Sequence, residues 1–284
     1  MRYGVIDIGS NSVRLLISEN GQSLKKLIIT ARLAENAKDG LLKKEPSFRA
    51  LKAVSDFVEM AKSDGADKIL VFATAAVRNS VNGKELADDI EKFCGIPVDI
   101  VSGETEGKLG VLGALHGKDG AVLDIGGGST EIAVKKGGKI IYSKSLPIGA
   151  VVLTDKFGQN ADKIYEYAKN IVKKYGEIPN ADFYCIGGTC TSLSAVAQKL
   201  AVYDPDKVDG YKFTLKEISR LADRICALKV DERKLLIGLQ KERADIIHAG
   251  ALIFKAVAEH VKADFTVKES DNLEGYLYYK TENL

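Results

Sequence analysis

Two short segments of the chain carry aspartate, glycine and hydroxyl side chains in the same order. They contain Asp7, Gly9, Ser10, Asn11 and Ser12 in the first segment, and Asp124, Gly126, Gly127, Gly128, Ser129, Thr130 and Glu131 in the second. Glycines at a turn let backbone N–H groups approach an anion closely, and the neighbouring hydroxyls add hydrogen-bond donors. We therefore predict that both turns bind phosphate. The alternative is that residues 126–128 only form a tight turn.

The acidic residues of these segments suit metal binding. A carboxylate among phosphates is a like-charge arrangement that a cation such as Mg²⁺ would stabilise. Asp7, Asp124 and Glu131 are therefore candidate ligands of a metal ion or of its water molecules. The chain has three histidines and four scattered cysteines, so a metal site or triad built on histidine is not expected.

Two further positions suit phosphate chemistry. Residues 187–189 (Gly-Gly-Thr) follow an apolar strand and precede a helix, where backbone amides and the positive helix end favour an anion. Arg78 follows another predicted strand, and its guanidinium can bind phosphate oxygens through two parallel hydrogen bonds. A solvated surface arginine is the alternative reading of Arg78.

A pair of glutamates opens a predicted helix after residue 102. Glu104 and Glu106 lie about 200° apart around a helix, so only one of them can face a given ligand. A glutamate near bound phosphate can act as a general base towards water, whereas a helix-capping role is the alternative. Gly107, Gly110 and Gly113 recur every three residues in this helix and permit close approach of another backbone.

Apolar β-branched runs alternate with helical stretches along the chain, which indicates an α/β fold. Both aspartate segments have the pattern strand, turn, strand, and Asp7 and Asp124 lie 117 residues apart, about the size of one small domain. We predict two similarly folded lobes that bring both turns together at a cleft. We also expect a helix that begins at Ser47 and a longer one over about residues 244–259.

The composition excludes several classes of protein. The net charge is +2 over 284 residues, so no overall field favours DNA or an anionic membrane as a partner. No apolar run reaches the ~18–20 residues that span a bilayer, and the first residues are unlike a signal peptide, so we expect a cytoplasmic location. The chain has no Gly-Lys-Ser/Thr loop, no Gly-x-Gly-x-x-Gly after the first strand and no Cys-x₅-Arg loop, which argues against P-loop, Rossmann and cysteine-phosphatase proteins.

Several blocks in order along the chain carry a family resemblance. They are residues 5–16, 73–78, 102–106, 124–131, 187–189, 242–247 and 270–275. Together they resemble the exopolyphosphatase / guanosine pentaphosphate phosphohydrolase (Ppx/GppA) family. The resemblance implies the actin-like, sugar-kinase-like ATPase fold, with two ribonuclease-H-like lobes and an interlobe cleft. The first lobe would comprise residues 1–117 plus about 269–284, and the second residues 118–268.

The resemblance also implies an activity. It is the Mg²⁺-dependent hydrolysis of terminal phosphoanhydride bonds in inorganic polyphosphate, guanosine pentaphosphate or both, with Mn²⁺ as an optional metal. Glu106 aligns with the family's catalytic glutamate that activates water, and Asp124 and Glu131 align with its acidic metal-site residues. The predicted phosphate-binding residues are Ser10, Asn11, Arg78, Gly126, Gly127, Gly128, Ser129, Gly187, Gly188 and Thr189.

Two other functions stay open at the level of the sequence. One is an ATP-dependent kinase of the same fold that phosphorylates a small acceptor. The other is a non-catalytic regulator that binds guanosine penta- or tetraphosphate. The sequence does not choose between polyphosphate and guanosine pentaphosphate, because both present the same terminal anhydride. A homodimer is compatible with base rates for oligomers.

Overall fold

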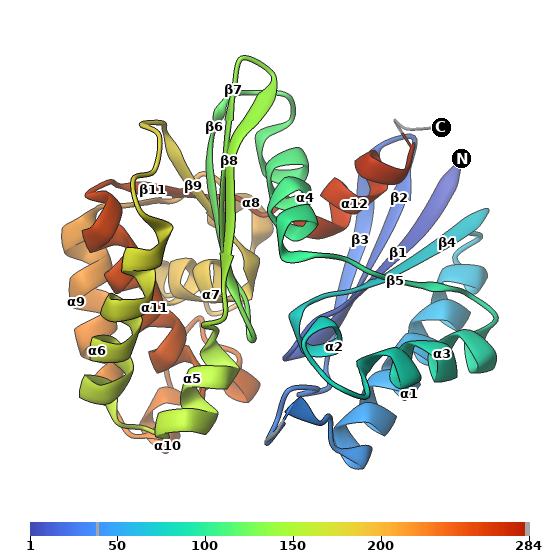
Figure 1. Ribbon diagram of the computed structural model, residues 1–284, viewed down its shortest axis with the longest axis horizontal. Helices are drawn as coiled ribbons and strands as arrows, with labels where there is room; N and C mark the ends of the chain where they lie inside the picture. Colours follow the sequence, from blue (N-terminus) through green and yellow to red (C-terminus); the bar gives the residue numbers. More distant parts are fainter. Residues whose placement is uncertain (38–39, 282–284) are drawn as a thin grey trace.

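The computed structural model describes residues 1–37 and 40–281, and two β-sheets lie side by side in it with helices packed on each (Figure 1). The first sheet has five strands in the order β3-β2-β1-β4-β5. The strands are β1 (Arg2–Ile8), β2 (Ser12–Glu19), β3 (Gln22–Thr30), β4 (Lys68–Ala73) and β5 (Val98–Ile100). β1, β2 and β3 form an antiparallel meander, whereas β4 and β5 run parallel to β1.

The first lobe contains this sheet and the helices α1 (Lys44–Ser63), α2 (Ala75–Arg78) and α3 (Gly83–Cys94). Its central strand β1 is covered on both faces, since Ile6 packs in one apolar cluster with Phe57 of α1, and Val5 packs in another with Tyr276. A strand buried on both faces reads as a continuous apolar run. α1 begins before the predicted Ser47, because a proline, Pro46, is tolerated in the first turn of a helix.

The second sheet repeats the first in its topology. Its strands are β6 (Gly120–Ile125), β7 (Thr130–Lys136), β8 (Lys139–Leu146), β9 (Phe183–Ile186), β10 (Lys212–Phe213) and β11 (Phe265–Val267). Their order is β10-β11-β9-β6-β7-β8, in which β6, β7 and β8 form the antiparallel meander and β9 and β11 run parallel to β6. β8-β7-β6-β9-β11 thus matches β3-β2-β1-β4-β5. The predicted α/β fold of two ribonuclease-H-like lobes in an actin-like arrangement is confirmed.

The second lobe carries most of the helices. They are α5 (Ala150–Phe157), α6 (Ala161–Val172), the 3₁₀ turn η2 (Lys173–Tyr175), α7 (Gly187–Gln198), α8 (Pro205–Val208), α9 (Leu215–Cys226), α10 (Val230–Arg233), the 3₁₀ turn η3 (Lys241–Arg243) and α11 (Ile247–Val261). α11 is the helix predicted over about residues 244–259. It begins later because the chain first forms η3, and it is the most deeply buried helix of this lobe's core.

Two helices cross between the sheets, α4 (Gly103–Leu115) and α12 (Asn272–Thr281) (Figure 1). α4 packs on β6, β7 and β8, and α12 packs on α4 and β1. A Cβ on Gly113 would lie 1.9 Å from the Asp271 carbonyl oxygen, and one on Gly275 would lie 1.9 Å from that of Leu109. The glycine stripe of α4 therefore permits the close backbone approach that the sequence predicted. The lobe boundaries at residues 117 and about 269 stay a prediction.

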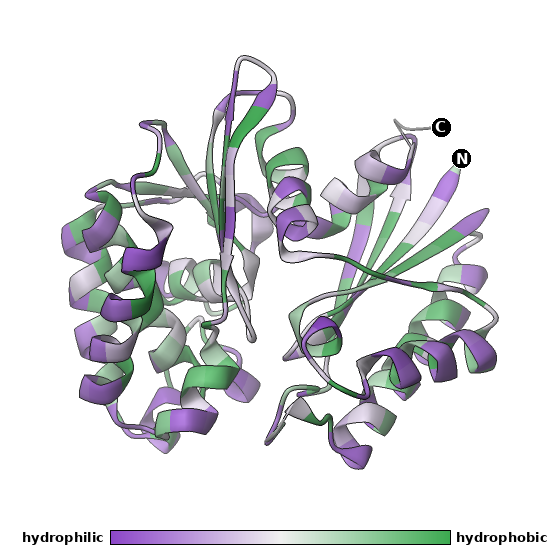
Figure 2. Ribbon diagram, in the orientation of Figure 1, coloured by the Kyte–Doolittle hydropathy of each residue, from purple (hydrophilic) through white to green (hydrophobic). Residues whose placement is uncertain are grey.

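Hydropathy follows this layering, with apolar residues concentrated in the strands and on the helix faces turned towards them (Figure 2). Polar residues gather on the outer helix faces. Across residues 1–37 and 40–281, no helix combines the length and the apolar character needed to cross a bilayer.

Candidate active site

The two aspartate segments form the tips of equivalent hairpins, and these tips touch. Residues 9–11 join β1 to β2, and residues 126–129 join β6 to β7. A Cβ on Gly128 would lie 2.5 Å from the Ser10 Oγ, and one on Gly127 would lie 3.0 Å from the Ser10 Cβ. A larger residue at either glycine would therefore require Ser10 of the opposite tip to shift. The two lobes therefore meet at their glycine turns.

A cleft of about 430 Å³ opens between the lobes at these tips. It gathers residues from segments that are far apart in the sequence. The predicted site residues that line it are Asp7, Ser10, Asn11, Glu106, Asp124, Gly126, Gly127, Gly128, Ser129, Gly187, Gly188 and Thr189. Arg78 and Glu131 do not line the cleft, although both contact or adjoin residues that do.

Glu106 reaches the cleft from the first turn of α4. Ser102 caps this helix, because its Oγ accepts a hydrogen bond from the Thr105 backbone N–H at 3.0 Å. The Glu106 side chain is buried, whereas Glu104 is exposed and pairs with Lys108 at 2.8 Å. The helix period thus turns one glutamate of the pair to the cleft and the other to solvent.

Arg78 is the direct partner of Glu106. Its Nη1 donates to the Glu106 Oε2 at 2.8 Å and to the Val101 carbonyl oxygen at 2.9 Å. Burial raises the pKa of the Glu106 carboxyl to about 7, against the opposing effect of the Arg78 charge. Glu106 is therefore held in one orientation and poised to accept a proton near neutral pH.

Three buried carboxylates lie together behind the second tip. Asp124 and Glu131 are paired in register on β6 and β7, and α4 adds Glu106. Each offers an oxygen atom, and the three atoms lie within 4.8 Å of one another. Burial raises the pKa of Asp124 to about 6, and burial together with the charges of Glu106 and Asp124 raises that of Glu131 well above its ordinary value. Crowded like charges of this kind favour either protonation or a bound cation.

The donor set fits a hard divalent cation. Carboxylate oxygens are the ligands that Mg²⁺ and Mn²⁺ prefer. The Glu131 Oε2 and the Asp7 Oδ1 are both buried without a hydrogen-bond partner among the described residues, although buried polar atoms are normally paired. Asp7 nevertheless differs from the other predicted ligands, because it lies outside the three-carboxylate cluster and its second oxygen is bound by an arginine.

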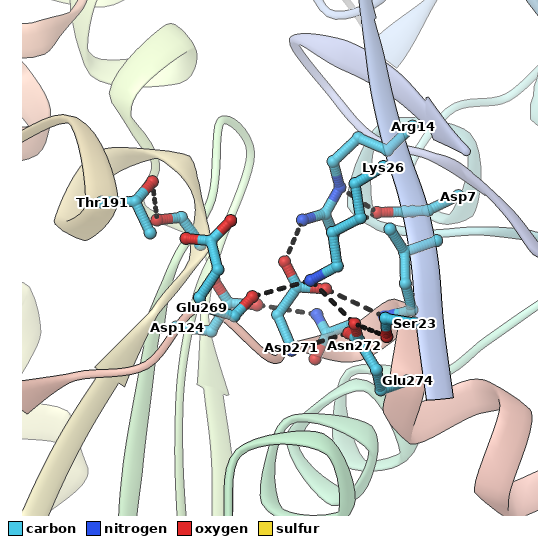
Figure 3. Close-up of polar contacts among 12 residues, drawn as sticks. Asp7, Arg14, Ser23, Lys26, Asp124, Thr191, Glu269, Asp271, Asn272 and Glu274 are labelled. Atoms are coloured by element: carbon cyan, nitrogen blue, oxygen red, sulfur yellow. Dashed lines mark hydrogen bonds and ion pairs between the residues drawn. The ribbon is translucent and has the colours of Figure 1, made fainter. Parts of the chain in front are cut away.

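That arginine, Arg14, links the first hairpin to the α12 segment (Figure 3). Its Nη2 lies 2.5 Å from the Asp7 Oδ2, and its Nη1 binds Asp271. Burial opposes ionisation of Asp271, but Arg14 and Lys26 outweigh it, so the pKa of Asp271 is lowered. The neighbouring Asn272 donates from Nδ2 to the Asp124 Oδ2 at 2.7 Å.

Sequence reasoning assigned no role to Arg14, Asp271 or Asn272. A signal for Arg14 existed, since it stands directly opposite Asp7 in the hairpin register and has the complementary charge. Asp271 and Asn272 lie in the block 270–275 that carried the family resemblance. Their partners across the cleft depend on how α12 packs, which no local pattern encodes.

The third glycine turn joins β9 to α7 and lies against Asp124. Gly187 has φ +82°, and a Cβ there would lie 2.4 Å from the Asp124 Oδ1. A Cβ on Gly188 would lie 2.3 Å from an Nη atom of Arg243. Arg243 also lines the cleft and has no ion pair with any carboxylate of the described residues. Burial, with the Arg14 charge as a second cause, lowers the pKa of its guanidinium to about 10.

The fold and this cleft define a two-lobed, actin-like α/β protein with glycine turns and buried carboxylates at the junction of its lobes. The model of the Ppx/GppA phosphatase family matches residues 5–282. The chain belongs to this family.

Individual relatives agree with the family match. A bifunctional 3-dehydroquinate synthase/phosphatase from Fusobacterium nucleatum is 31% identical over 311 residues, which cover 98% of this chain and 46% of that protein. The chain thus spans about half of that relative. Exopolyphosphatase 2 from Mycobacterium tuberculosis is 27% identical over 309 residues, which cover 96% of this chain and 97% of the relative.

Solved structures are similar over the whole chain. The Aquifex aeolicus PPX-GPPA enzyme superposes with a TM-score of 0.80 at 28% identity and covers 98% of this chain and 99% of its own. An exopolyphosphatase from Cytophaga hutchinsonii gives a TM-score of 0.89 at 24% identity over 100% of this chain and 99% of its own, which supports the fold.

Proposed function

We propose that this protein hydrolyses the terminal phosphoanhydride bond of inorganic polyphosphate, guanosine pentaphosphate or both. The observation that carries the proposal is the position of Glu106, buried in the cleft beside Asp124 and Glu131 and oriented by Arg78. The names of family relatives, an exopolyphosphatase and a guanosine-5'-triphosphate,3'-diphosphate pyrophosphatase, support the substrate class.

The glycine turns would hold the terminal phosphates. Backbone N–H groups of residues 10–11, 127–129 and 187–189 can donate to phosphate oxygens, with the side chains of Ser10, Asn11, Ser129 and Thr189 as further donors. The N–H groups of Gly9 and Gly126 already donate to the Ser12 and Ser129 carbonyl oxygens. Arg243 adds a positive charge beside the third turn, against Gly188. Arg78 remains a proposed phosphate ligand, although one of its three guanidinium nitrogens, Nη1, already donates to Glu106.

Asp124 and Glu131, with Asp7 as a further candidate, would hold the metal ion, which we propose to be Mg²⁺ or Mn²⁺. When bound, such an ion would neutralise charge on the phosphate oxygens. Glu106 takes the proton from a water molecule whose oxygen attacks the terminal phosphorus in line with the bridging oxygen. A P–O bond to water forms, the anhydride P–O bond breaks, and the shortened phosphate chain leaves.

An assay of orthophosphate release with each of the two substrates tests this proposal. The purified protein with Mg²⁺ should release orthophosphate from polyphosphate, from guanosine pentaphosphate or from both, without an added acceptor. Glu106→Gln should lower kcat by about 10²–10⁴-fold, the usual contribution of a general base, and should keep the substrate Kd within a few-fold.

Glu104→Gln is the matched control, because Glu104 lies on the same helical turn but faces solvent. It should retain wild-type activity. An unchanged kcat in Glu106→Gln would contradict the proposed role of this residue. ATP turnover that requires an acceptor would instead identify a kinase, and tight nucleotide binding without orthophosphate release would identify a regulator.

A further inference from the structure

Arg32 and Asp245 form a two-pronged ion pair between the lobes. Arg32 follows β3 in the first lobe, and Asp245 follows η3 in the second. The Arg32 Nη1 lies 2.7 Å from the Asp245 Oδ2, and its Nη2 lies 3.2 Å from the Oδ1. The same Nη2 donates to the Glu242 carbonyl oxygen at 3.0 Å. One side chain thus binds both ends of the turn that contains Arg243.

The backbone of Arg32 is attached to the first glycine tip. Its N–H donates to the Asn11 carbonyl oxygen at 2.7 Å, and the Ala34 N–H donates to that of Ser10 at 2.9 Å. Arg32 adopts φ +51°, a left-handed conformation that non-glycine residues rarely take and that the surrounding structure must hold in place. The position of its side chain is therefore coupled to the position of the tip.

The other end of the ion pair is equally well fixed. The Asp245 carbonyl oxygen accepts a hydrogen bond from the Gln159 Nε2 at 2.9 Å. The next residue, Ile246, is 7% exposed and packs in the apolar cluster of the first lobe with Leu33 and Ala34. At this point the lobes are therefore joined by an ion pair and, beside it, by a buried apolar contact.

We propose that Arg32 is a positioning residue for the cleft. It connects the first phosphate-binding tip to the turn that carries Arg243, so that the Arg243 guanidinium and the tip are held at a fixed distance from one another. The expected effect on catalysis rests on the proposed function. The positioning itself concerns only the distance between the first tip and the turn that contains Arg243. A group placed correctly before binding costs less to order on binding.

Two measurements without turnover test Arg32 directly. Arg32→Ala should speed amide hydrogen exchange over residues 241–247 in the free protein, because the turn loses its anchors. It should also weaken the binding of inorganic tripolyphosphate, measured by calorimetry, by about three- to fivefold, the upper part of the range for the loss of a partly exposed ion pair. Arg32→Lys keeps the positive charge but not the two-pronged guanidinium, so its amide exchange rate and tripolyphosphate affinity should fall between those of Arg32→Ala and the wild type.

Turnover supplies a further readout that a purely structural role would not move. Arg32→Ala should raise KM by a factor similar to the loss of tripolyphosphate affinity and leave kcat within about twofold, because Arg32 does not touch the reacting atoms. The double variant Arg32→Glu, Asp245→Arg should restore binding and KM to within about twofold of wild type, since it rebuilds the pair in reverse.

Arg2→Ala is a matched control. Arg2 also binds a carboxylate, Glu19 at 3.2 Å, and a carbonyl oxygen, that of Asp64 at 2.5 Å, but within the first lobe. The proposal would be overturned if amide exchange and tripolyphosphate affinity in Arg32→Ala matched those in Arg2→Ala. It would also be overturned if the double variant bound tripolyphosphate no better than the single variants Arg32→Glu and Asp245→Arg. Absence of orthophosphate release by the wild type would refute the proposed function alone, because amide exchange still decides the role of Arg32.

Discussion

The guanidinium of Arg78 donates to the carboxylate of Glu106 over 2.8 Å, and both side chains are largely buried. The pair joins α2, at the end of β4, to the first turn of α4. Because Arg78 also binds the Val101 carbonyl oxygen, its guanidinium is held from two sides. The proposed base is therefore oriented by a rigid partner.

Arg78→Met should lower kcat by at least about tenfold, because Glu106 loses the hydrogen bond that orients it and is left as a buried, unpaired carboxylate. Arg78→Lys should retain more activity, since an ammonium restores the charge but not the geometry. Steady-state kinetics on both variants check this. Equal activity in Arg78→Met and the wild type would show that Glu106 does not depend on this contact.

Removal of divalent metal should stop orthophosphate release, and Mg²⁺ or Mn²⁺ should restore it. A second readout is independent of activity. The ion should raise the Tm of the wild type, because binding to the folded state stabilises it, and this increment should disappear in Asp124→Asn and in Glu131→Gln. A full metal-dependent increment in both variants would place the ion elsewhere.

Gly113→Ala should destabilise the protein by roughly 1–3 kcal/mol, the usual cost of overpacking a tight contact. The new Cβ would lie 1.9 Å from the Asp271 carbonyl oxygen and would push α12 away from α4. Activity should fall as well, because Asp271 and Asn272 lose their places beside Arg14 and Asp124. Urea unfolding measures the loss. Lys108→Ala, on the exposed side of α4, is the control and should stay within about 0.5 kcal/mol.

Because of His248, the free energy of unfolding should decrease as the pH is lowered from about 6.5 to about 4. It is fully buried in α11, and its Nε2 lies 3.1 Å from the Gly158 carbonyl oxygen. Burial, with the charge of Arg233 as a second cause, lowers its pKa from 6.5 to about 4. The unfolded chain then binds the proton more readily, so this stability is complete above about pH 6.5 and is lost as the pH falls towards 4.

The full loss at His248 amounts to about 3 kcal/mol at 1.36 kcal/mol for each unit of pKa. His248→Gln cannot titrate and should flatten the pH dependence of the free energy of unfolding over this range. Urea unfolding at several pH values gives the comparison. Parallel profiles for the variant and the wild type would assign the acid sensitivity to other groups.

Much of the fold was readable in the sequence because it depends on local patterns. The repeated strand, turn and strand around Asp7 and Asp124 predicted two equivalent hairpins, and both sheets have the same order around them. The helical period predicted that one of Glu104 and Glu106 would face the site, and the structure turns Glu106 inward. The spacing of Gly107, Gly110 and Gly113 predicted a close backbone approach.

The partners of the site residues were less predictable. Phosphate binding by Arg78 stays a prediction, but its hydrogen bond to Glu106 and its position outside the cleft lining were not foreseen. Metal binding by Asp7 also stays a prediction, but its ion pair with Arg14 and its place outside the three-carboxylate cluster were not foreseen. An isolated residue type shows what a side chain can bind, but its actual partner depends on which segment packs beside it.

By itself, the sequence determined the elements and the chemical inventory of this protein: two hairpin tips of glycine and hydroxyl groups, a glycine-lined helix and a small set of carboxylates. Those features follow from short-range periodicity and side-chain chemistry. Only the tertiary structure decided which charges meet, because Arg14 with Asp271, Asn272 with Asp124, and Arg32 with Asp245 join residues more than 100 positions apart. Such pairs form where lobes and helices pack, and burial then sets their protonation.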